Sequence, residues 1–189
     1  MNTQKIRSDQ ELIQRSVKGD PEAFGDLYER YLDQIYRYVY YRVQTVEEAE
    51  DLTESVFIRV WEDLRSRKNK KEIRNFNAWL YRAAHNLVID HYRKKRPAQI
   101  NLDGPSEAIQ SPGPGTEEAA IGRIDSRNLA KALQNLEPTA QNVIILRFLN
   151  GLSHSETAQA LELNEGHVRV IQYRALKQLR GILKEDRHD

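Results

Sequence analysis

The sequence predicts an all-α protein with two small helical domains joined by a linker. Apolar residues recur at steps of three and four along most of the 189 residues, and no segment alternates convincingly with a period of two. Residues 97–115 interrupt this pattern with four of the six prolines and three of the nine glycines. Such a segment is typical of an extended or mobile tether. We expect domains over 1–96 and 117–189, with a linker over 97–116.

Capping patterns place the first helices. Ser8–Glu11 is a capping box before a short helix, and Asp20–Pro21 sets a capping carboxylate before a proline at the first helical position. Thr45–Glu48 is another capping box, and residues 76–92 read as a further long helix. Two helices carry an apolar stripe, one with Phe24, Leu27, Tyr28, Tyr31, Ile35, Tyr38 and Val39, the other with Leu52, Val56, Val60 and Leu64.

The second domain is expected to contain helices near 117–136, 138–149, 153–161 and 164–184, of which the last two form a helix-turn-helix. Ser153 begins a capping box, and Asn164 is a good cap for the last helix. Its predicted inward residues are Val168, Ile171, Ala175, Leu176 and Leu179.

The last helix has a basic outer surface. Between Gly166 and Gly181 there are four basic residues and no acid. Arginine can read guanine edges, and lysine and arginine neutralise phosphates, so this helix fits a DNA major groove. The plainer alternative is an amphipathic hairpin whose basic face meets only water.

Charge in the first domain is sorted into blocks. Residues 47–64 hold seven acids and Arg59 as the only base, whereas residues 65–96 hold eleven bases and two acids. The basic block also contains aromatic residues, which stack on unpaired bases, so the mixture suits opened nucleic acid. Against this, Trp79 and Tyr81 cannot face the same way on a helix, so at least one belongs to the core. Arg93–Arg96 also fits a solvated end that complements the helix dipole.

Composition excludes several classes of protein. The chain has no cysteine, which rules out disulfides and thiolate metal sites and fits a cytoplasmic location. No stretch is long and apolar enough to span a membrane, and the N-terminus lacks a secretory apolar region. There is no glycine-rich phosphate loop, nucleophile elbow or metal-ligand cluster, so we expect no enzyme, cofactor or metal.

The motifs together resemble the extracytoplasmic-function (ECF) group of sigma factors over residues 9–183. They occur in family order, with the family's linker between them. The matching segments are Asp20–Phe24, Glu50–Asp51–Leu52, Val56–Trp61, Phe76–Asn86, Leu136–Phe148 and Gly151–Ser153.

This resemblance implies an alternative sigma factor that binds core RNA polymerase and directs promoter-specific transcription initiation through the −10 and −35 elements. The first domain would contact the β′ clamp helices, with the β flap as a further polymerase contact, and would also melt the promoter. The linker would thread toward the active-site channel, and an anti-sigma factor is an expected partner.

The resemblance also implies site residues. Polymerase contacts would come from Asp51, Glu54, Ser55 and Ile58. Contacts to the −10 element would come from Trp79, Arg82, Asn86, Arg93 and Lys94, with Asn86 helping to capture a flipped base. Contacts to the −35 element would come from His167, Arg169, Val170, Gln172, Tyr173, Arg174 and Lys177.

Two departures from the family pattern affect these expectations. Glu54–Ser55 stands where the family usually has Gln-Glu, so the polymerase contact is expected to differ in detail. Glu162 stands where glycine is frequent, so we expect a differently shaped turn. The main rival is a helix-turn-helix regulator that never touches polymerase. It explains the second domain but not the charge blocks of the first.

Overall fold

The structure is a computed structural model that describes residues 8–66, 73–95 and 128–185. All regular secondary structure in these ranges is helical, which confirms the predicted all-α class. The predicted linker at 97–116 lies outside the described residues, as does the part of the predicted 117–136 helix before residue 128.

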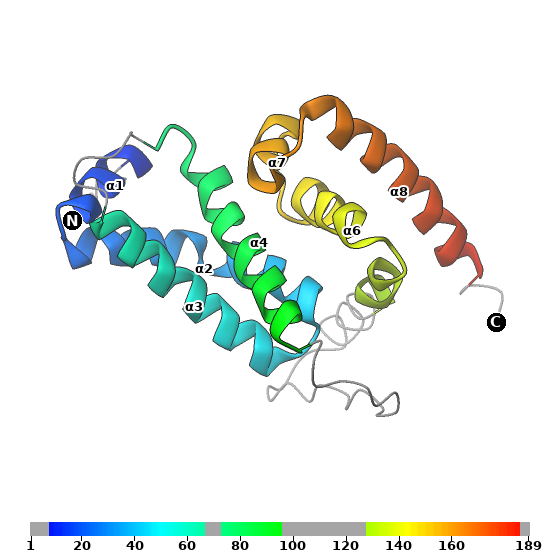
Figure 1. Cartoon of the computed structure of the whole chain (residues 1–189), viewed down its shortest axis with the longest axis horizontal. Coiled ribbons are helices and arrows are strands. Elements are labelled where there is room, and N and C mark those ends of the chain that lie inside the picture. Colours follow the sequence, from blue (N-terminus) through cyan, green and yellow to red (C-terminus); the bar gives the residue numbers. More distant parts are fainter. Residues whose placement is uncertain (1–7, 67–72, 96–127, 186–189) are drawn as a thin grey trace, which may run out of the picture.

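Four helices form an N-terminal unit. They are α1 (Asp9–Val17), α2 (Pro21–Val43), α3 (Val46–Arg65) and α4 (Phe76–Lys95). Helix α2 packs against the other three, and α3 packs against α1 and α4. Figure 1 shows α1 to α3 gathered at one end of the molecule with α4 facing the remaining helices.

The predicted caps are partly confirmed. The Ser8 hydroxyl accepts a hydrogen bond from the Glu11 backbone N–H at 3.3 Å. The carboxylate of Asp20 accepts from two backbone N–H groups at 3.0 and 3.2 Å, so the start of α2 is fixed as predicted. The capping box at Thr45 is wrong, because the Thr45 side chain makes no capping hydrogen bond. Glu48 turns instead toward Lys95 at the end of α4.

The predicted apolar stripes form the core of this unit. On α2, Ile35, Tyr38 and Val39 are fully buried, and on α3 Val56 and Val60 are fully buried. One residue of the predicted stripe on α2, Tyr28, is not enclosed and remains 37% exposed.

A C-terminal unit contains the remaining helices. They are residues 128–134, α6 (Pro138–Ile144), η1 (Ile145–Leu149), α7 (His154–Leu161) and α8 (Glu165–Glu185). Helix α8 packs against α6 and α7.

The predicted single helix over 138–149 changes its winding after Ile144. Its last turn, η1, is a π-helical turn in which the Asn150 backbone N–H donates to the Ile145 carbonyl five residues earlier, at 3.0 Å. Gly151 follows with a φ of 72°, a left-handed conformation that glycine adopts without a Cβ clash. The wide turn leads the chain away from α6 and into α7.

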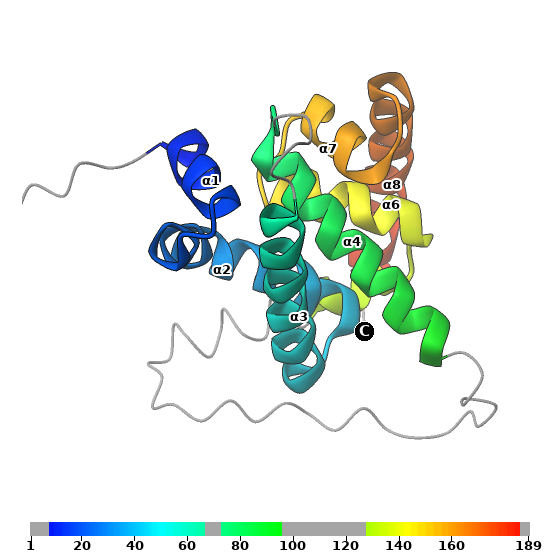
Figure 2. The ribbon, with the colours of Figure 1, turned by 60° about the vertical axis from the view of Figure 1, so that its left-hand side comes forward.

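The two units pack directly against each other. Helix α4 lies between α3 and α7, and η1 rests on α2 (Figures 1 and 2). One buried apolar cluster runs from residues of α2 and α4 into Ile145 and Leu146 of η1.

Candidate functional site

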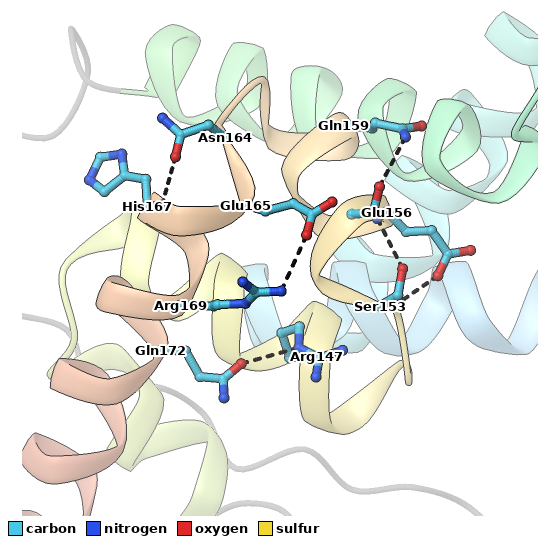
Figure 3. A network of polar contacts seen from close by, with 10 residues as sticks. Arg147, Ser153, Glu156, Gln159, Asn164, Glu165, His167, Arg169 and Gln172 are labelled. Atoms are coloured by element: carbon cyan, nitrogen blue, oxygen red, sulfur yellow. Dashed lines mark hydrogen bonds and ion pairs between the residues drawn. The ribbon is translucent and has the colours of Figure 1, made fainter.

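The helix-turn-helix is held by local hydrogen bonds that the sequence anticipates. The Ser153 hydroxyl accepts from the Glu156 backbone N–H at 3.1 Å, and the Glu156 carboxylate accepts from the Ser153 N–H at 2.8 Å. Burial acts to raise the pKa of the Glu156 carboxyl, but hydrogen bonds to the carboxylate from the Ser153 N–H and from the side chains of Ser153, Asn77 and Asn75 hold it below its usual value. Asn164 then caps α8 by accepting from the His167 N–H at 2.7 Å. Figure 3 shows the two caps, one at the start of each helix.

The turn between α7 and α8 keeps a left-handed residue although that residue is not glycine. Glu162 adopts φ 56° and ψ 37°, and its N–H donates to the Ala158 carbonyl. The expectation of a differently shaped turn is therefore wrong. Hydrogen bonding around the corner holds Glu162 in a conformation that costs a residue with a side chain on the order of 1–2 kcal/mol.

Helix α8 presents most of its predicted DNA-facing residues to solvent. Tyr173 is 72% exposed, Val170 is 47% exposed and the Arg169 side chain is 63% exposed. The buried residues are Val168, Ala175 and Leu179, as predicted, whereas Leu176 is 39% exposed and does not point inward. The other exposed residues of the predicted set are His167, Arg174 and Lys177.

Gln172 differs from the other predicted DNA contacts. Its amide oxygen accepts from Arg147 Nε at 3.1 Å, so the side chain lies against η1 (Figure 3). The guanidinium of Arg147 also donates to the Leu152 carbonyl. In this arrangement Gln172 links α8 to the chain that precedes α7, so the predicted contact with DNA would require that bond to be exchanged.

Three predicted −10 residues share one surface hollow on α4. Trp79, Arg82 and Asn86 follow one another at steps of three and four, and they line a hollow of about 360 Å³ beside α3. The remaining lining residues are Arg59, Asp63, Ala83, Leu87 and Asp90. Arg93 and Lys94 lie outside this hollow on the exposed last turn of α4, where Arg93 pairs with Asp90 at 3.0 Å.

The two aromatic residues at the start of α4 have different roles. Tyr81 is fully buried, and burial raises the pKa of its phenol to about 12. Trp79 is half-buried, packs against Phe76 with tilted rings whose centroids are 5.7 Å apart, and borders the hollow. The prediction that at least one of the pair belongs to the core is confirmed by Tyr81.

A larger groove lies between α2 and α3. It has a volume of about 760 Å³ and a mainly apolar lining. Of the predicted polymerase-binding residues, Glu54 and Ile58 line it, and Ile58 is 52% exposed. Asp51 and Ser55 are exposed on α3 but do not border the groove.

Sequence periodicity missed most of the residues that form this groove. Its apolar wall consists of Pro21, Phe24, Tyr28, Leu32, Tyr36, Phe57 and Trp61. The predicted stripe on α2 contained Phe24 and Tyr28. In the described residues these two side chains line the groove, and periodicity alone does not reveal that no other helix covers them. Acids border the groove at Asp33, Glu50 and Glu54. Burial, and secondly the nearby charge of Glu50, raise the pKa of Tyr36.

The acidic and basic blocks meet where α3 begins and α4 ends. The carboxylate of Glu48 pairs with Lys95 and lies 3.5 Å from His91 Nε2. This pairing joins Lys95, one residue of the basic helix end, to the first turn of α3.

No helix in the part of the chain that the structure describes is long and apolar enough to cross a bilayer. No group of three or more histidine, cysteine, aspartate or glutamate side chains gathers there as a metal site.

Two known protein families match this chain, one in each of its two helical units. Residues 27–98 match Sigma-70 region 2, which covers most of the N-terminal unit. Residues 132–181 match Sigma-70 region 4, which contains the helix-turn-helix.

Relatives that match most of this chain are also sigma factors. The ECF RNA polymerase sigma factor SigW of Bacillus subtilis is 32% identical, over 92% of this chain and 95% of its own length. SigX of the same organism is 30% identical over 89% of each chain. BldN of Streptomyces coelicolor is 38% identical over 93% of this chain, which spans 66% of that relative.

Solved structures support the fold. CnrH in complex with the cytosolic domain of CnrY gives a TM-score of 0.74 at 23% identity, covering 94% of this chain and 98% of that one. RpoE in complex with the anti-sigma factor NepR from Bartonella quintana gives 0.68 at 23% identity, covering 85% and 96%. With both sigma regions matched in order and full-length relatives at 30% identity or more, the chain belongs to the ECF sigma factors, the alternative sigma factors that direct promoter-specific transcription initiation by RNA polymerase.

Proposed function

We propose that different parts of this sigma factor have different roles in transcription initiation. Residues 1–96 dock on core polymerase and bind the opened −10 element, residues 97–116 act as a tether, and residues 117–189 read the −35 element. The chain acts in the cytoplasm as a regulatory subunit without catalysis of its own.

The −10 assignment depends on one observation above all. Trp79, Arg82 and Asn86 converge on the same hollow, although they are spread over two turns of α4. An unpaired base needs an aromatic surface for stacking, an amide for its hydrogen-bonding edge and a cation for its phosphate. This combination favours binding of an extruded base over binding of an intact duplex, and a plain duplex-binding regulator has no use for it.

The polymerase assignment depends on the groove between α2 and α3. Phe57, Trp61 and Ile58 form part of a concave apolar surface with acids on its border. An amphipathic helix with basic flanks fits such a surface, because its apolar side fills the groove and its charges complement the border. We assign this groove, together with Asp51 and Ser55 beside it, to the β′ clamp helices of polymerase.

The −35 assignment depends on the outer face of α8. Arg169, Tyr173 and Arg174 are exposed there with Lys177, on a helix whose start is fixed by the Asn164 cap. A helix with a fixed start and an uncovered basic face can enter a major groove with little reorganisation.

Run-off transcription with the purified full-length protein and bacterial core polymerase tests the proposal. Defined transcripts should appear from a promoter library only when the protein is added. Asn86→Ala should retain binding to core but fail to open the promoter, as judged by permanganate reactivity of unpaired thymines. Absence of transcripts together with absence of co-elution with core would favour the duplex-binding regulator.

We also propose an anti-sigma partner for this chain. CnrH and RpoE, its structural neighbours, were solved in complexes with CnrY and with the anti-sigma factor NepR. The groove between α2 and α3 offers such a partner an apolar binding surface. A partner that co-purifies with the chain and suppresses run-off transcription in proportion to its concentration would support this. Unaffected transcription at saturating partner would reject it.

A further inference from the structure

One line of exposed residues runs along the outer side of α8. Gly166, Val170, Tyr173 and Lys177 follow one another at steps of four, three and four, so they share one side of the helix. The opposite side is buried, with Val168, Ala175 and Leu179 in the core. This outer line is therefore the part of α8 that lies farthest from the body of the protein.

Two residues of the outer line expose apolar surface. Val170 is 47% exposed and Tyr173 is 72% exposed. Single exposed apolar residues are common on proteins, but these two are one turn apart in the middle of a basic surface. Valine also has a lower helix propensity than arginine or glutamine. Neither packing nor helix propensity accounts for a valine at position 170.

Gly166, at the start of the outer line, also has no explanation within the described chain. Its φ is not positive, so the backbone does not require glycine. A Cβ there would meet only the Asn164 side-chain oxygen, at 3.4 Å, which is van der Waals contact. Glycine within a helix is less stable than alanine. A bare backbone at an exposed helix start is useful where another molecule approaches closely.

Charged residues border the outer line on both sides. Arg169 lies on one side, where its guanidinium is 3.4 Å from the Glu165 carboxylate one turn earlier (Figure 3). Arg174 lies on the other side and is exposed. When such a helix enters a major groove, cations on its flanks face the phosphates of the groove walls, and the line between them faces the base edges.

The chemistry of the base edges decides what an apolar line can recognise. In the major groove the C5-methyl group of thymine is an apolar feature among hydrogen-bond donors and acceptors. Valine offers neither donor nor acceptor, so placing it over a polar base edge leaves that edge without a partner. Over a thymine methyl, the same side chain buries two apolar groups against each other.

The short side chain of Val170 makes this contact depend on a close approach. Valine extends only one bond beyond its Cβ, so the helix backbone must lie near the base edges. Gly166 lies one turn before Val170 on the same line and removes the side chain that would hold the helix away. The two unexplained residues thus serve one contact.

We propose that α8 selects an A·T pair in the −35 element by packing Val170, with the ring of Tyr173 beside it, against the thymine methyl group, and that Gly166 permits the necessary approach. The inference rests on the proposed −35 function of α8. It adds the class of base that the helix requires and the residues that impose this requirement.

Removal of single methyl groups from the promoter tests the inference. A promoter found by run-off transcription is prepared with deoxyuridine in place of each thymine of the −35 element, one at a time and on either strand. Affinity is measured for the complex of the full-length protein with core polymerase. At one position or more it should fall about fourfold, the factor that corresponds to about 0.8 kcal/mol for one buried methyl-sized group. Deoxyuridine in the spacer should have no effect.

Val170→Ala shows whether the valine detects that methyl group. The variant should bind the thymine and deoxyuridine promoters nearly equally at the sensitive position, while its affinity for core polymerase is unchanged. The converse uses 5-methylcytosine. Replacing the sensitive T·A pair by C·G should weaken binding, and a methyl group on that cytosine should restore part of it for the original protein but not for Val170→Ala.

Gly166→Ala tests the close approach, with Gly181→Ala as its matched control. Gly181 is also exposed on α8, and a Cβ there would meet nothing within 4 Å. Neither variant should lower the melting temperature. Only Gly166→Ala should lose promoter affinity, by at least about fivefold, the factor for losing about 1 kcal/mol of base contact. Both should bind core polymerase normally.

The outcomes separate the inference from the proposed function. If no promoter is transcribed with core polymerase, the proposed function fails. If promoters are transcribed but deoxyuridine equals thymine throughout the −35 element, or the element contains no A·T pair, the inference is overturned. An unchanged preference for thymine in Val170→Ala, or equal promoter affinity of the two glycine variants, would also overturn it.

Discussion

The hydroxyl of Tyr38 donates a hydrogen bond to Oδ1 of Asn142, 104 positions later in the sequence, at 2.9 Å. Tyr38 is fully buried, and burial raises the pKa of its phenol well above the usual value, so it remains a neutral donor. The bond joins the centre of α2 to α6. It therefore reports on contact between the two units more directly than any surface ion pair does.

Replacing this hydroxyl should weaken the contact between the units without disrupting the N-terminal core. Tyr38→Phe keeps the ring, which packs edge-on against Tyr81 with centroids 5.8 Å apart. Loss of the bond should lower the free energy of unfolding by about 0.5–1.5 kcal/mol, measured by urea denaturation. Tyr40→Phe, on the half-buried side of the same helix, serves as the control and should change it by less than about 0.5 kcal/mol. Equal effects of the two variants would contradict this role.

Contact between the units should also depend on pH through His85. Burial, and secondly the charge of Arg42, lower the pKa of His85 to about 4, while Glu162 acts weakly in the opposite sense. Tyr38, the other group at the imidazole, stays neutral throughout this range. The closed state therefore holds His85 neutral, whereas an open state lets its pKa return toward 6.5.

The sign of the effect follows from proton binding. Between about pH 6.5 and pH 4 the open state binds more protons at His85 than the closed state, so acid favours opening. Solution X-ray scattering measures the separation of the two units at each pH. The radius of gyration should increase from pH 7.5 to pH 5, and His85→Gln should remove most of that increase. A pH dependence unchanged in His85→Gln would rule out the histidine as its source.

Local sequence signals predicted the helices well because their causes are local. Asp20 and Asn164 cap the helices that they were predicted to begin, since a capping bond involves only neighbouring residues. The capping bond predicted for Thr45 does not form, and the Glu48 carboxylate is paired with Lys95 from another helix. The π-helical turn at Ile145 was missed, because its apolar pattern is the same as that of an α-helix.

The site was predicted less completely, for a related reason. Periodicity identifies Tyr28 as apolar-facing, but only the packing of α2 on α3 leaves it as part of a groove. The contacts of Tyr38 and Arg42 with Asn142 and Gln141 span about a hundred residues, and no pattern in one sequence pairs them. By contrast, the residues on α4 were found together because one helix face brings them together.

The corner of the helix-turn-helix should tolerate glycine better than its own residue. Glu162 has a left-handed backbone, which glycine adopts without strain, so Glu162→Gly should raise the free energy of unfolding by up to about 1 kcal/mol. Glu162→Gln keeps the strain but removes the charge that pairs with Arg82, and it should be nearly neutral because that pair is exposed. Thermal unfolding of both variants gives the comparison. A glycine variant less stable than the glutamine variant would show that the strain is unimportant.

Disruption of the α2–α3 groove should weaken binding to core polymerase without unfolding the protein. Ile58 is 52% exposed, so Ile58→Lys should alter stability by less than about 0.5 kcal/mol. It places a charge in an apolar groove, and affinity for core should fall about tenfold or more, measured by fluorescence anisotropy. Glu62→Gln makes the same change in net charge on an exposed part of α3 outside the groove, and should leave affinity nearly unchanged. If both variants bind alike, the groove is not the docking surface.

Removal of one arginine from α8 should separate promoter reading from polymerase binding. Arg174 is exposed on the outer face of the helix, remote from the groove that we assign to polymerase. If it reads a base edge, Arg174→Ala should lose about 1–3 kcal/mol of discrimination at one −35 position, while affinity for core is retained. Arg180→Ala removes the same charge from the same helix and should cause a smaller loss that is uniform across sequences, with a reduced salt dependence. Transcription from a panel of −35 variants measures both. An equal loss on all promoters for Arg174→Ala would assign it to phosphate contact, because only a base contact makes the loss depend on sequence.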